Sequence, residues 1–256
     1  MIIALDVGNT HIVIGCIDNG TISRVIRVST NTAKTADEYA AEMCEILDFH
    51  NVNRTTISGA IISCVVPPLT AVLRDAVRML VGFNALVVGA GIKTGLNILI
   101  DDPAQLGADM VATAVGALAS HQPPIIIVDL GTATKMFVLD KNGGFIGGAI
   151  LPGIALSMNA LVTGTSQLPY VSLEAPAKCI SANTIDCMKS GAIFGAASAI
   201  DGMAERFEAQ LGLPAQIIAT GGLADSVYRY CKREIIYDPH LILRGLGVIY
   251  EKNKRK

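Results

Sequence analysis

One pattern occurs twice in the chain, 123 residues apart, and it limits the folds that the sequence can adopt. A short apolar run ends in an aspartate, a turn with glycine follows, and a second run leads to a hairpin turn with asparagine. The equivalent pairs are Asp6 and Asp129, Gly8 and Gly131, and Asn19 and Asn142. Because one offset holds at three different kinds of position, we interpret the pattern as an internal duplication that gives two similar halves.

The strands that we expect in the two halves follow the same order. Those of the first copy cover residues 2–6, 11–17 and 21–29, and those of the second cover 125–129, 136–140 and 145–150. In the second copy we expect the turn to extend from Gly131 to Thr134. Each copy is thus predicted to contain a meander of three strands.

The other segments alternate between helical and extended patterns. We expect helices at 37–50, 106–120 and 154–161, a helix that follows a turn at Pro67-Pro68 and ends at Met79, and a long helix within 181–211. We expect strands at 59–64, 85–88 and 216–220. The sequence His121-Gln122-Pro123-Pro124 has the composition of a link between domains. We therefore predict an α/β protein with mixed sheets, divided into domains 1–120 and 121–256.

Composition excludes several classes of function. Of the 256 residues, 51% are hydrophobic and 16% are charged, which rules out a disordered chain. No apolar run reaches the length of a membrane span, and the first residues lack the basic region of a signal peptide. The net charge of −2 predicts no nucleic-acid partner. We expect a soluble cytoplasmic protein.

Cysteine and histidine spacing offers no metal site. The six cysteines show no Cys-x-x-Cys spacing, and most occur in apolar stretches, as is typical of buried reduced thiols. The four histidines are scattered along the chain. We expect no cluster of ligands for a transition metal.

The duplicated turns have the residues that phosphate binding needs. In Asp6-Val7-Gly8-Asn9-Thr10 a strand ends in a carboxylate, and the turn presents backbone amides, an amide side chain and a hydroxyl. The aspartate suits Mg²⁺ bound through water, and Asp129-Leu130-Gly131-Thr132 repeats the arrangement. Either turn alone is more simply an ordinary hairpin, but the duplication favours two turns that clamp one triphosphate.

Two further segments could contact ligands. Thr220-Gly221-Gly222 follows an apolar run and precedes an expected helix, so backbone there could approach adenine, although a plain strand-to-helix turn fits as well. Asp109 begins a predicted helix, where it is either a first-turn acid or a general base for an acceptor hydroxyl. By contrast, Gly89-Ala90-Gly91-Ile92-Lys93-Thr94 lacks the spacer of a P-loop.

Together these motifs resemble the type III pantothenate kinase family, within the acetate and sugar kinase/Hsp70/actin superfamily. The resemblance covers nearly the whole chain, and the segments that carry it are Asp6–Thr10, Asp129–Thr134, Gly147–Gly153 and Thr220–Gly222. It implies two actin-like, ribonuclease H-like halves around a nucleotide cleft. It also implies ATP-dependent phosphorylation of pantothenate to 4′-phosphopantothenate, the first step of coenzyme A biosynthesis, by a homodimer.

The resemblance assigns roles to individual residues. Asp109 would be the catalytic base, Asp6 would bind Mg²⁺, and Asp129 would lie near a monovalent cation, either potassium or ammonium. The ATP contacts would come from Asp6, Val7, Gly8, Asn9, Thr10, His11, Ile12, Val13, Thr132, Gly221 and Gly222. The acceptor contacts would come from Gly107, Ala108, Asp109, Met110 and, across the dimer interface, Thr184.

Several positions depart from the family pattern, mostly on the acceptor side. Met110 stands where the family has an arginine for the pantothenate carboxylate, and Ile100 replaces a tyrosine of the pantothenate pocket. Lys135 replaces a threonine, and Cys187-Met188-Lys189-Ser190-Gly191 replaces Ser-Met-Gln-Ser-Gly. Two alternatives therefore stay open, namely a kinase for another small hydroxylated acceptor and a non-catalytic nucleotide-binding or regulatory relative.

Overall fold

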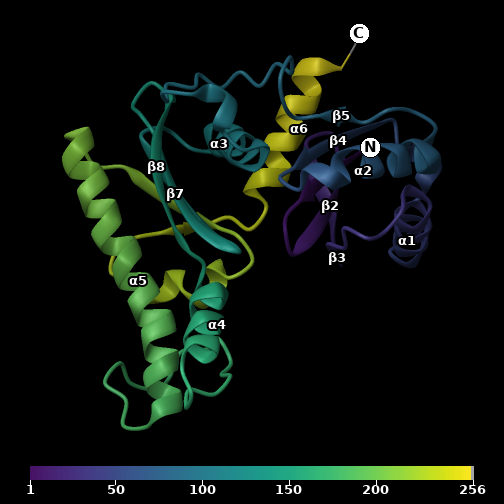
Figure 1. Cartoon of the computed structure of the whole chain (residues 1–256). Helices are drawn as coiled ribbons and strands as arrows, with labels where there is room; N and C mark the ends of the chain where they lie inside the picture. The colour runs from purple at the N-terminus through teal and green to yellow at the C-terminus, as the bar shows by residue number, and fades with distance from the viewer. Residues whose placement is uncertain (255–256) are drawn as a thin grey trace. The chain divides into compact units, whose positions relative to one another are not determined.

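The computed structural model describes residues 1–254, which divide into two compact units (Figure 1). Unit 1 comprises Met1–Leu96, Asp102–Ser120 and the C-terminal helix, and unit 2 comprises Asn97–Asp101 and His121–His240. A boundary between the units falls after Ser120, where the predicted link begins. The C-terminal helix packs with unit 1 although the sequence-based division places it in the second domain, and residues 255 and 256 of that domain lie outside the described residues.

Unit 1 is built on a mixed five-stranded sheet in the order β3-β2-β1-β4-β5. Its strands are β1 (Ile2–Val7), β2 (His11–Asp18), β3 (Thr21–Ser29), β4 (Gly59–Cys64) and β5 (Leu86–Val87). Its helices are α1 (Ala36–Phe49), α2 (Pro67–Val81), α3 (Ala108–Ser120) and α6 (Leu241–Asn253), with short 3₁₀ turns η1 (Arg54–Thr56) and η2 (Pro103–Gln105). Strand β1 pairs antiparallel with β2 and parallel with β4.

Alternation along β1 decides which side chains meet which helices. Ile3, Leu5 and Val7 join the core that α1 and α2 complete with Tyr39 and Leu73. Successive side chains of a strand point to opposite faces, so Ala4 and Asp6 face the other way, toward the side of the sheet on which α6 and α3 pack. The last side chain of β1 on that second face is therefore a carboxylate.

Unit 2 contains a second mixed sheet in the order β10-β9-β6-β7-β8. Its strands are β6 (Ile125–Leu130), β7 (Ala133–Leu139), β8 (Phe145–Pro152), β9 (Gln216–Thr220) and β10 (Ile236–Tyr237). Helices α4 (Ile154–Gly164) and α5 (Thr184–Leu211) run side by side, and the 3₁₀ turns η3 (Ala224–Ser226) and η4 (Tyr228–Tyr230) follow β9 (Figure 1). Val128 and Met136 pack with Ile193 and Ile200 of α5, so one face of this sheet is buried against α5.

The two sheets have the same construction. In each, the central strand pairs antiparallel with the next strand along the chain and parallel with a later one, and β1 and β6 both extend over six residues. The mixed sheets predicted from the 123-residue repeat are thereby confirmed. The hairpin turns also match, because Gly20 and Gly143 both adopt positive φ, at 80° and 79°.

Two sequence-based expectations about this fold are wrong. Strand β7 begins at Ala133, so Thr134 and Lys135 belong to the strand and not to a turn. No α-helix opens after Gly222, because the 3₁₀ turns η3 and η4 occupy that stretch. A helix N-terminus is therefore not part of the Gly221-Gly222 segment.

Helix α6 was not predicted, since Gly245 and Gly247 weaken a helical pattern by about 1 kcal/mol each. Its glycines serve close packing instead. A Cβ at Gly245 would lie 1.7 Å from the carbonyl oxygen of Ala112 in α3, and one at Gly116 would lie 2.0 Å from the carbonyl oxygen of Leu241. The contact between α3 and α6, which needs glycine on both helices, outweighs the local propensity.

The cysteines differ from expectation as well. Of the six, only Cys16 is buried, while Cys179 and Cys187 are exposed and the others are half-buried. Burial raises the pKa of the Cys16 thiol, and it raises the pKa of Cys231 to about 12. All six are free thiols.

No helix among residues 1–254 is long and apolar enough to cross a membrane.

Candidate functional site

In unit 1 the candidate site lies at the carboxyl ends of β1 and β4. Asp6 of β1 is the register partner of Ser63 of β4, so both side chains point to the same face of the sheet. The backbone N–H of Val65 donates to the carbonyl of Val7 at 3.0 Å, which holds the two strand ends together. Carboxyl ends of parallel strands are the usual location of ligand sites in α/β sheets.

Ser63 is a polar side chain that the sequence analysis missed. It is fully buried, and its hydroxyl has no hydrogen-bond partner among the described residues. Buried hydroxyl groups normally have partners, so an unsatisfied one beside Asp6 points to a ligand or an ion. The signal in the sequence is weak, because a single serine after the apolar run Ala60–Ile62 is unremarkable.

The first predicted phosphate turn connects β1 to β2. The N–H of Gly8 donates to the carbonyl of His11 at 3.0 Å, so this amide closes the turn and is not offered to a phosphate. Thr30 fixes the turn from outside, with its hydroxyl donating to the carbonyl of Gly8 at 2.6 Å and its N–H donating to that of Thr10 at 3.0 Å. Asn9, Thr10 and His11 are exposed at its tip, whereas Val7 and Ile12 are buried and Val13 is half-buried.

Asp109 lies in the first turn of α3, half-buried. Its Oδ1 accepts a hydrogen bond from the N–H of Met110 at 2.8 Å. A Cβ at Gly107 would lie 2.5 Å from this Oδ1 and 3.9 Å from Cγ1 of Val65. The glycine therefore makes room for the carboxylate, and the start of α3 lies beside the segment that leaves β4.

The second predicted phosphate turn, in unit 2, is shorter. The N–H of Gly131 donates to the carbonyl of Ala133 at 3.2 Å, and Thr132 is exposed at the tip. A Cβ at Gly153, the residue that precedes α4, would lie 2.1 Å from the carbonyl oxygen of Thr132. Gly153 thus lets the start of α4 pass directly against this turn.

Asp129 has a charged neighbour that the sequence analysis did not foresee. It is the register partner of Lys135 in β7, and the lysine Nζ lies 2.7 Å from Asp129 Oδ2. Both side chains are 19% exposed. This ion pair follows from β7 beginning at Ala133, because a lysine in a longer turn would have no fixed register with β6.

Gly221 closes the other side of the same carboxylate. Its φ is +97°, and a Cβ there would lie 2.6 Å from Asp129 Oδ1 and 2.7 Å from the backbone of Leu130. The N–H of Leu223 donates to the carbonyl of Leu130 at 3.0 Å, which holds the turn against the end of β6. Gly222 is exposed, with nothing within 4 Å of its Cβ position, so backbone is open to a flat ligand there.

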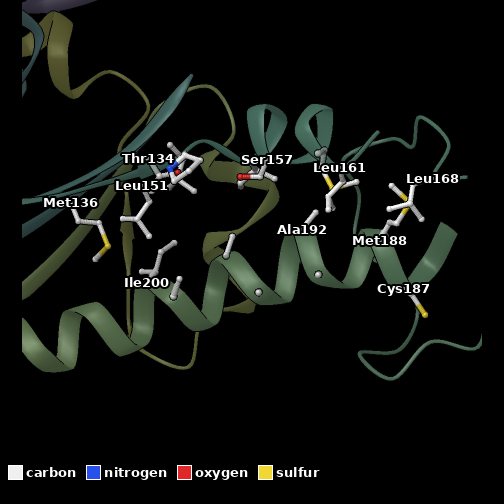
Figure 2. A pocket seen from close by; sticks show the side chains of 18 of the residues that line it. Thr134, Met136, Leu151, Ser157, Leu161, Leu168, Cys187, Met188, Ala192 and Ile200 are labelled. Carbon is white, nitrogen blue, oxygen red and sulfur yellow. The ribbon is translucent and has the colours of Figure 1, made fainter. Parts of the chain in front are cut away.

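A cavity of about 540 Å³ lies between β7, β8, α4 and α5 (Figure 2). Its lining is mostly apolar, with Thr134 and Leu151 at the sheet end and Leu168 and Cys187 near the start of α5 (Figure 2). Thr184, the predicted acceptor contact, also lines it. Thr134 faces this cavity, so Lys135 and its partner Asp129 lie on the opposite face of the sheet.

The predicted site residues fall into two groups. Unit 1 brings Asp6 and the start of α3 to one face of its sheet, and unit 2 brings Asp129, Thr132 and Gly221 to the end of β6. Thr184 stands apart from the second group, on the α4–α5 face. Met110 and Ile100 are both half-buried, in unit 1 and unit 2 respectively.

The residues present fit Mg²⁺ but not a monovalent cation. Within residues 1–254 no group of three His, Cys, Asp or Glu side chains could hold an ion. Mg²⁺ bound with a nucleotide keeps several waters and takes only one or two carboxylates, so Asp6 with the hydroxyl of Ser63 is sufficient. At Asp129, by contrast, the Lys135 ammonium already contacts the carboxylate.

Solved structures with this architecture share the fold at low sequence identity. A protein from Campylobacter jejuni described as a conserved putative Baf family transcriptional activator matches with a TM-score of 0.62 and 20% identity, over 98% of each chain. A putative 2-dehydro-3-deoxygalactonokinase from Sinorhizobium meliloti matches with a TM-score of 0.59 and 12% identity, over 100% of this chain and 98% of the other. These likenesses confirm the predicted actin-like fold.

Sequence comparison narrows this class to a family. The family model described as type III pantothenate kinase matches residues 2–206. Type III pantothenate kinases from an Exiguobacterium and a Geobacillus species are each 38% identical, over 100% of this chain and 100% and 99% of theirs. The chain belongs to the type III pantothenate kinase family, as its motifs predicted, and this membership is consistent with ATP-dependent phosphorylation of pantothenate.

The unsatisfied hydroxyl of Ser63 yields a prediction about stability. Ser63→Ala removes a buried polar group that makes no hydrogen bond in the chain, so we expect the free energy of unfolding to stay the same or rise by about 1 kcal/mol. Urea unfolding of the ligand-free protein measures the change. Ser190→Ala is the matched control, because the Ser190 hydroxyl donates to the carbonyl of Cys179 at 2.6 Å, and its loss should destabilise. A loss of more than about 1 kcal/mol in Ser63→Ala would show that its hydroxyl has a partner.

Proposed function

We propose that this protein phosphorylates pantothenate to 4′-phosphopantothenate with ATP, as the first step of coenzyme A biosynthesis. The observation that carries the proposal is the convergence, in unit 1, of Asp6, the buried hydroxyl of Ser63 and the start of α3 with Asp109. Family membership supplies the reaction, and this convergence supplies the acidic groups that it needs. Because ATP is the phosphate donor, we place the protein in the cytoplasm.

Each unit contributes its own residues to the proposed reaction. Asp6 and Ser63 would hold Mg²⁺, which would supply positive charge to neutralise the phosphates. In unit 1 the exposed tip of the β1–β2 turn, Asn9 to His11, offers contacts for ATP phosphate. In unit 2 Thr132 offers a further phosphate contact, and the open backbone at Gly222, next to Gly221, offers a contact for adenosine. Gly107, Ala108 and Met110 border the acceptor, and Asp109 takes the proton from its hydroxyl as that oxygen attacks the γ-phosphorus and ADP leaves.

The assignment of Asp109 as the base is directly testable. Asp109→Asn keeps the side-chain oxygen that accepts from the Met110 N–H but removes the ability to take a proton. We expect kcat to fall by about 10²-fold or more with ATP affinity little changed. Asp102→Asn is the control, since Asp102 caps the 3₁₀ turn η2 before α3 and has no assigned chemical role. If Asp109→Asn were less stable but kept full specific activity, Asp109 would stabilise the start of α3 and would not be the catalytic base.

The arginine that the family pattern places at position 110 to bind the carboxylate of pantothenate is replaced here by methionine. Met110 cannot donate a side-chain hydrogen bond, so it offers the carboxylate no partner. A hydrogen bond to a charged group contributes about 1.5–3 kcal/mol, so its absence should weaken pantothenate binding roughly tenfold to a hundredfold. This departure keeps a second candidate open, a kinase for an acceptor without a carboxylate.

Substitution at Met110 distinguishes these two acceptors. If pantothenate is the acceptor, Met110→Arg should raise kcat/KM for pantothenate about tenfold or more, mainly through KM, because arginine supplies a forked contact to the carboxylate. Met110→Leu, which keeps size without charge, should leave KM unchanged. Steady-state kinetics over a range of pantothenate concentrations give the answer. No change in KM with arginine would favour the uncharged acceptor.

We further propose that two copies of the chain associate through the α4–α5 face. Gly191 and Gly195 are exposed on α5 with nothing within 4 Å of their Cβ positions, although they lie between the buried residues of that helix. Apolar side chains are exposed around them, with Leu156 at 51%, Leu161 at 44% and Ile185 at 48%. Small and apolar residues left open on one face favour close packing of another helix. In such a dimer Thr184, which lies away from Asp129 in its own unit, serves the partner subunit.

Light scattering tests the dimer. We expect the wild-type protein to have about twice the chain mass of 26.8 kDa. Gly195→Glu puts a charge on the proposed interface and should give a monomer with strongly reduced activity, because Thr184 no longer reaches a partner. Gly89→Glu, at an exposed and open glycine of unit 1, should stay dimeric. A fully active wild-type monomer at assay concentration would contradict the proposal.

A further inference from the structure

We infer that the side-chain ammonium of Lys135 takes the place of the monovalent cation at Asp129, so that catalysis by this protein requires no potassium or ammonium. The inference rests on the proposed function for its kinetic test. Its carrying observation is the 2.7 Å contact between Lys135 Nζ and Asp129 Oδ2. An ammonium ion is one of the two cations that the family resemblance implies here, and the lysine supplies the same group on a tether.

The backbone fixes the position of this ammonium. Asp129 and Lys135 are register partners in adjacent antiparallel strands, and directly opposite side chains in such a pair have Cβ atoms about 5 Å apart. The lysine therefore reaches the carboxylate without leaving the sheet. Both side chains are 19% exposed, so solvent screens this pair less than it would a pair on the open surface.

The surroundings of Asp129 leave little space for a second cation. On the Oδ1 side the carboxylate lies directly against Gly221, where even a Cβ would be only 2.6 Å from Oδ1. On the Oδ2 side it contacts the ammonium. A potassium ion bound there would have to displace Lys135 or share the carboxylate with a like charge at close range, and that repulsion opposes binding.

The two copies of the repeat differ in the residue that lies opposite the aspartate, and only the second copy has a lysine there. Asp6, the equivalent of Asp129, has Val13 as its register partner in β2. Valine offers no charge at that position, whereas the carboxylate of the second copy has a lysine opposite it. The cation that contacts Asp129 is thus covalently attached to the chain.

The kinetic test compares cations in wild-type protein and a variant. ADP release with pantothenate and Mg²⁺-ATP is measured in tetramethylammonium buffer with and without roughly 100 mM potassium, and ADP is quantified by chromatography so that no coupling enzyme adds its own cation requirement. For the wild-type protein, the rate of ADP release with potassium should differ from the rate without it by less than about twofold. Lys135→Thr restores the residue of the family pattern. Without potassium, this variant should release ADP about tenfold or more slowly than the wild type, and added potassium should restore its rate.

A binding test works even if pantothenate is the wrong acceptor. Thermal unfolding in potassium and in tetramethylammonium, without nucleotide, should give one melting temperature for the wild type and a higher one in potassium for Lys135→Thr, because only the variant binds the ion. Lys141→Thr, at an exposed lysine of the β7–β8 turn, is the matched control and should behave as wild type in both tests. If the protein phosphorylated no acceptor in any of these salts, the proposed function would be refuted, but this comparison of melting temperatures would remain valid.

Three results would overturn the inference. The first is potassium activation of the wild-type protein by about tenfold or more. The second is a Lys135→Thr variant that stays active and indifferent to potassium, which would show that no cation is needed at Asp129. The third is a folded Lys135→Thr variant that loses activity and neither recovers with nor is stabilised by potassium, which would give Lys135 a role that a free cation cannot fill.

Discussion

Both halves of the molecule depend on the alternation of side chains along their central strands. In β1 the residues Ile3, Leu5 and Val7 are buried against helices, and in β6 the residues Ile126, Val128 and Leu130 are buried in the same way. That burial fixes the register, because a shift by one residue would exchange the two faces. As a consequence Asp6 and Asp129 must point to the other face at the strand ends, where the turns and the neighbouring parallel strands meet.

The duplicated frame lets the two copies specialise. The carboxylate of Asp6 has an apolar register partner, Val13, and lies beside the unsatisfied hydroxyl of Ser63. The carboxylate of Asp129 instead lies between the Lys135 ammonium and the backbone of Gly221. One position in the repeat thus gives two electrostatic environments, and the difference is set by which residue occupies the adjacent strand.

Much of this frame could be predicted from the sequence, and the failures have identifiable causes. The repeat at Asp6 and Asp129 predicted both sheets, since strand periodicity and hairpin glycines are local signals. Helix α6 was missed because its glycines serve the contact with α3, which local propensity cannot reveal. The ion pair was missed because the start of β7 was placed too late, and element ends are the least certain part of such predictions.

The roles of site residues were only partly accessible in the same way. Motifs pointed to Asp109 and Gly221, but the buried hydroxyl of Ser63 depends on pairing between β1 and β4, which are distant in sequence.

The most direct measurement of the central claim is product analysis of the wild-type protein with Mg²⁺-ATP and pantothenate in potassium-free buffer. Our account predicts 4′-phosphopantothenate by mass spectrometry, formed in equal amount to ADP. Intact ATP binding with no phosphorylated pantothenate, with or without potassium, would contradict it.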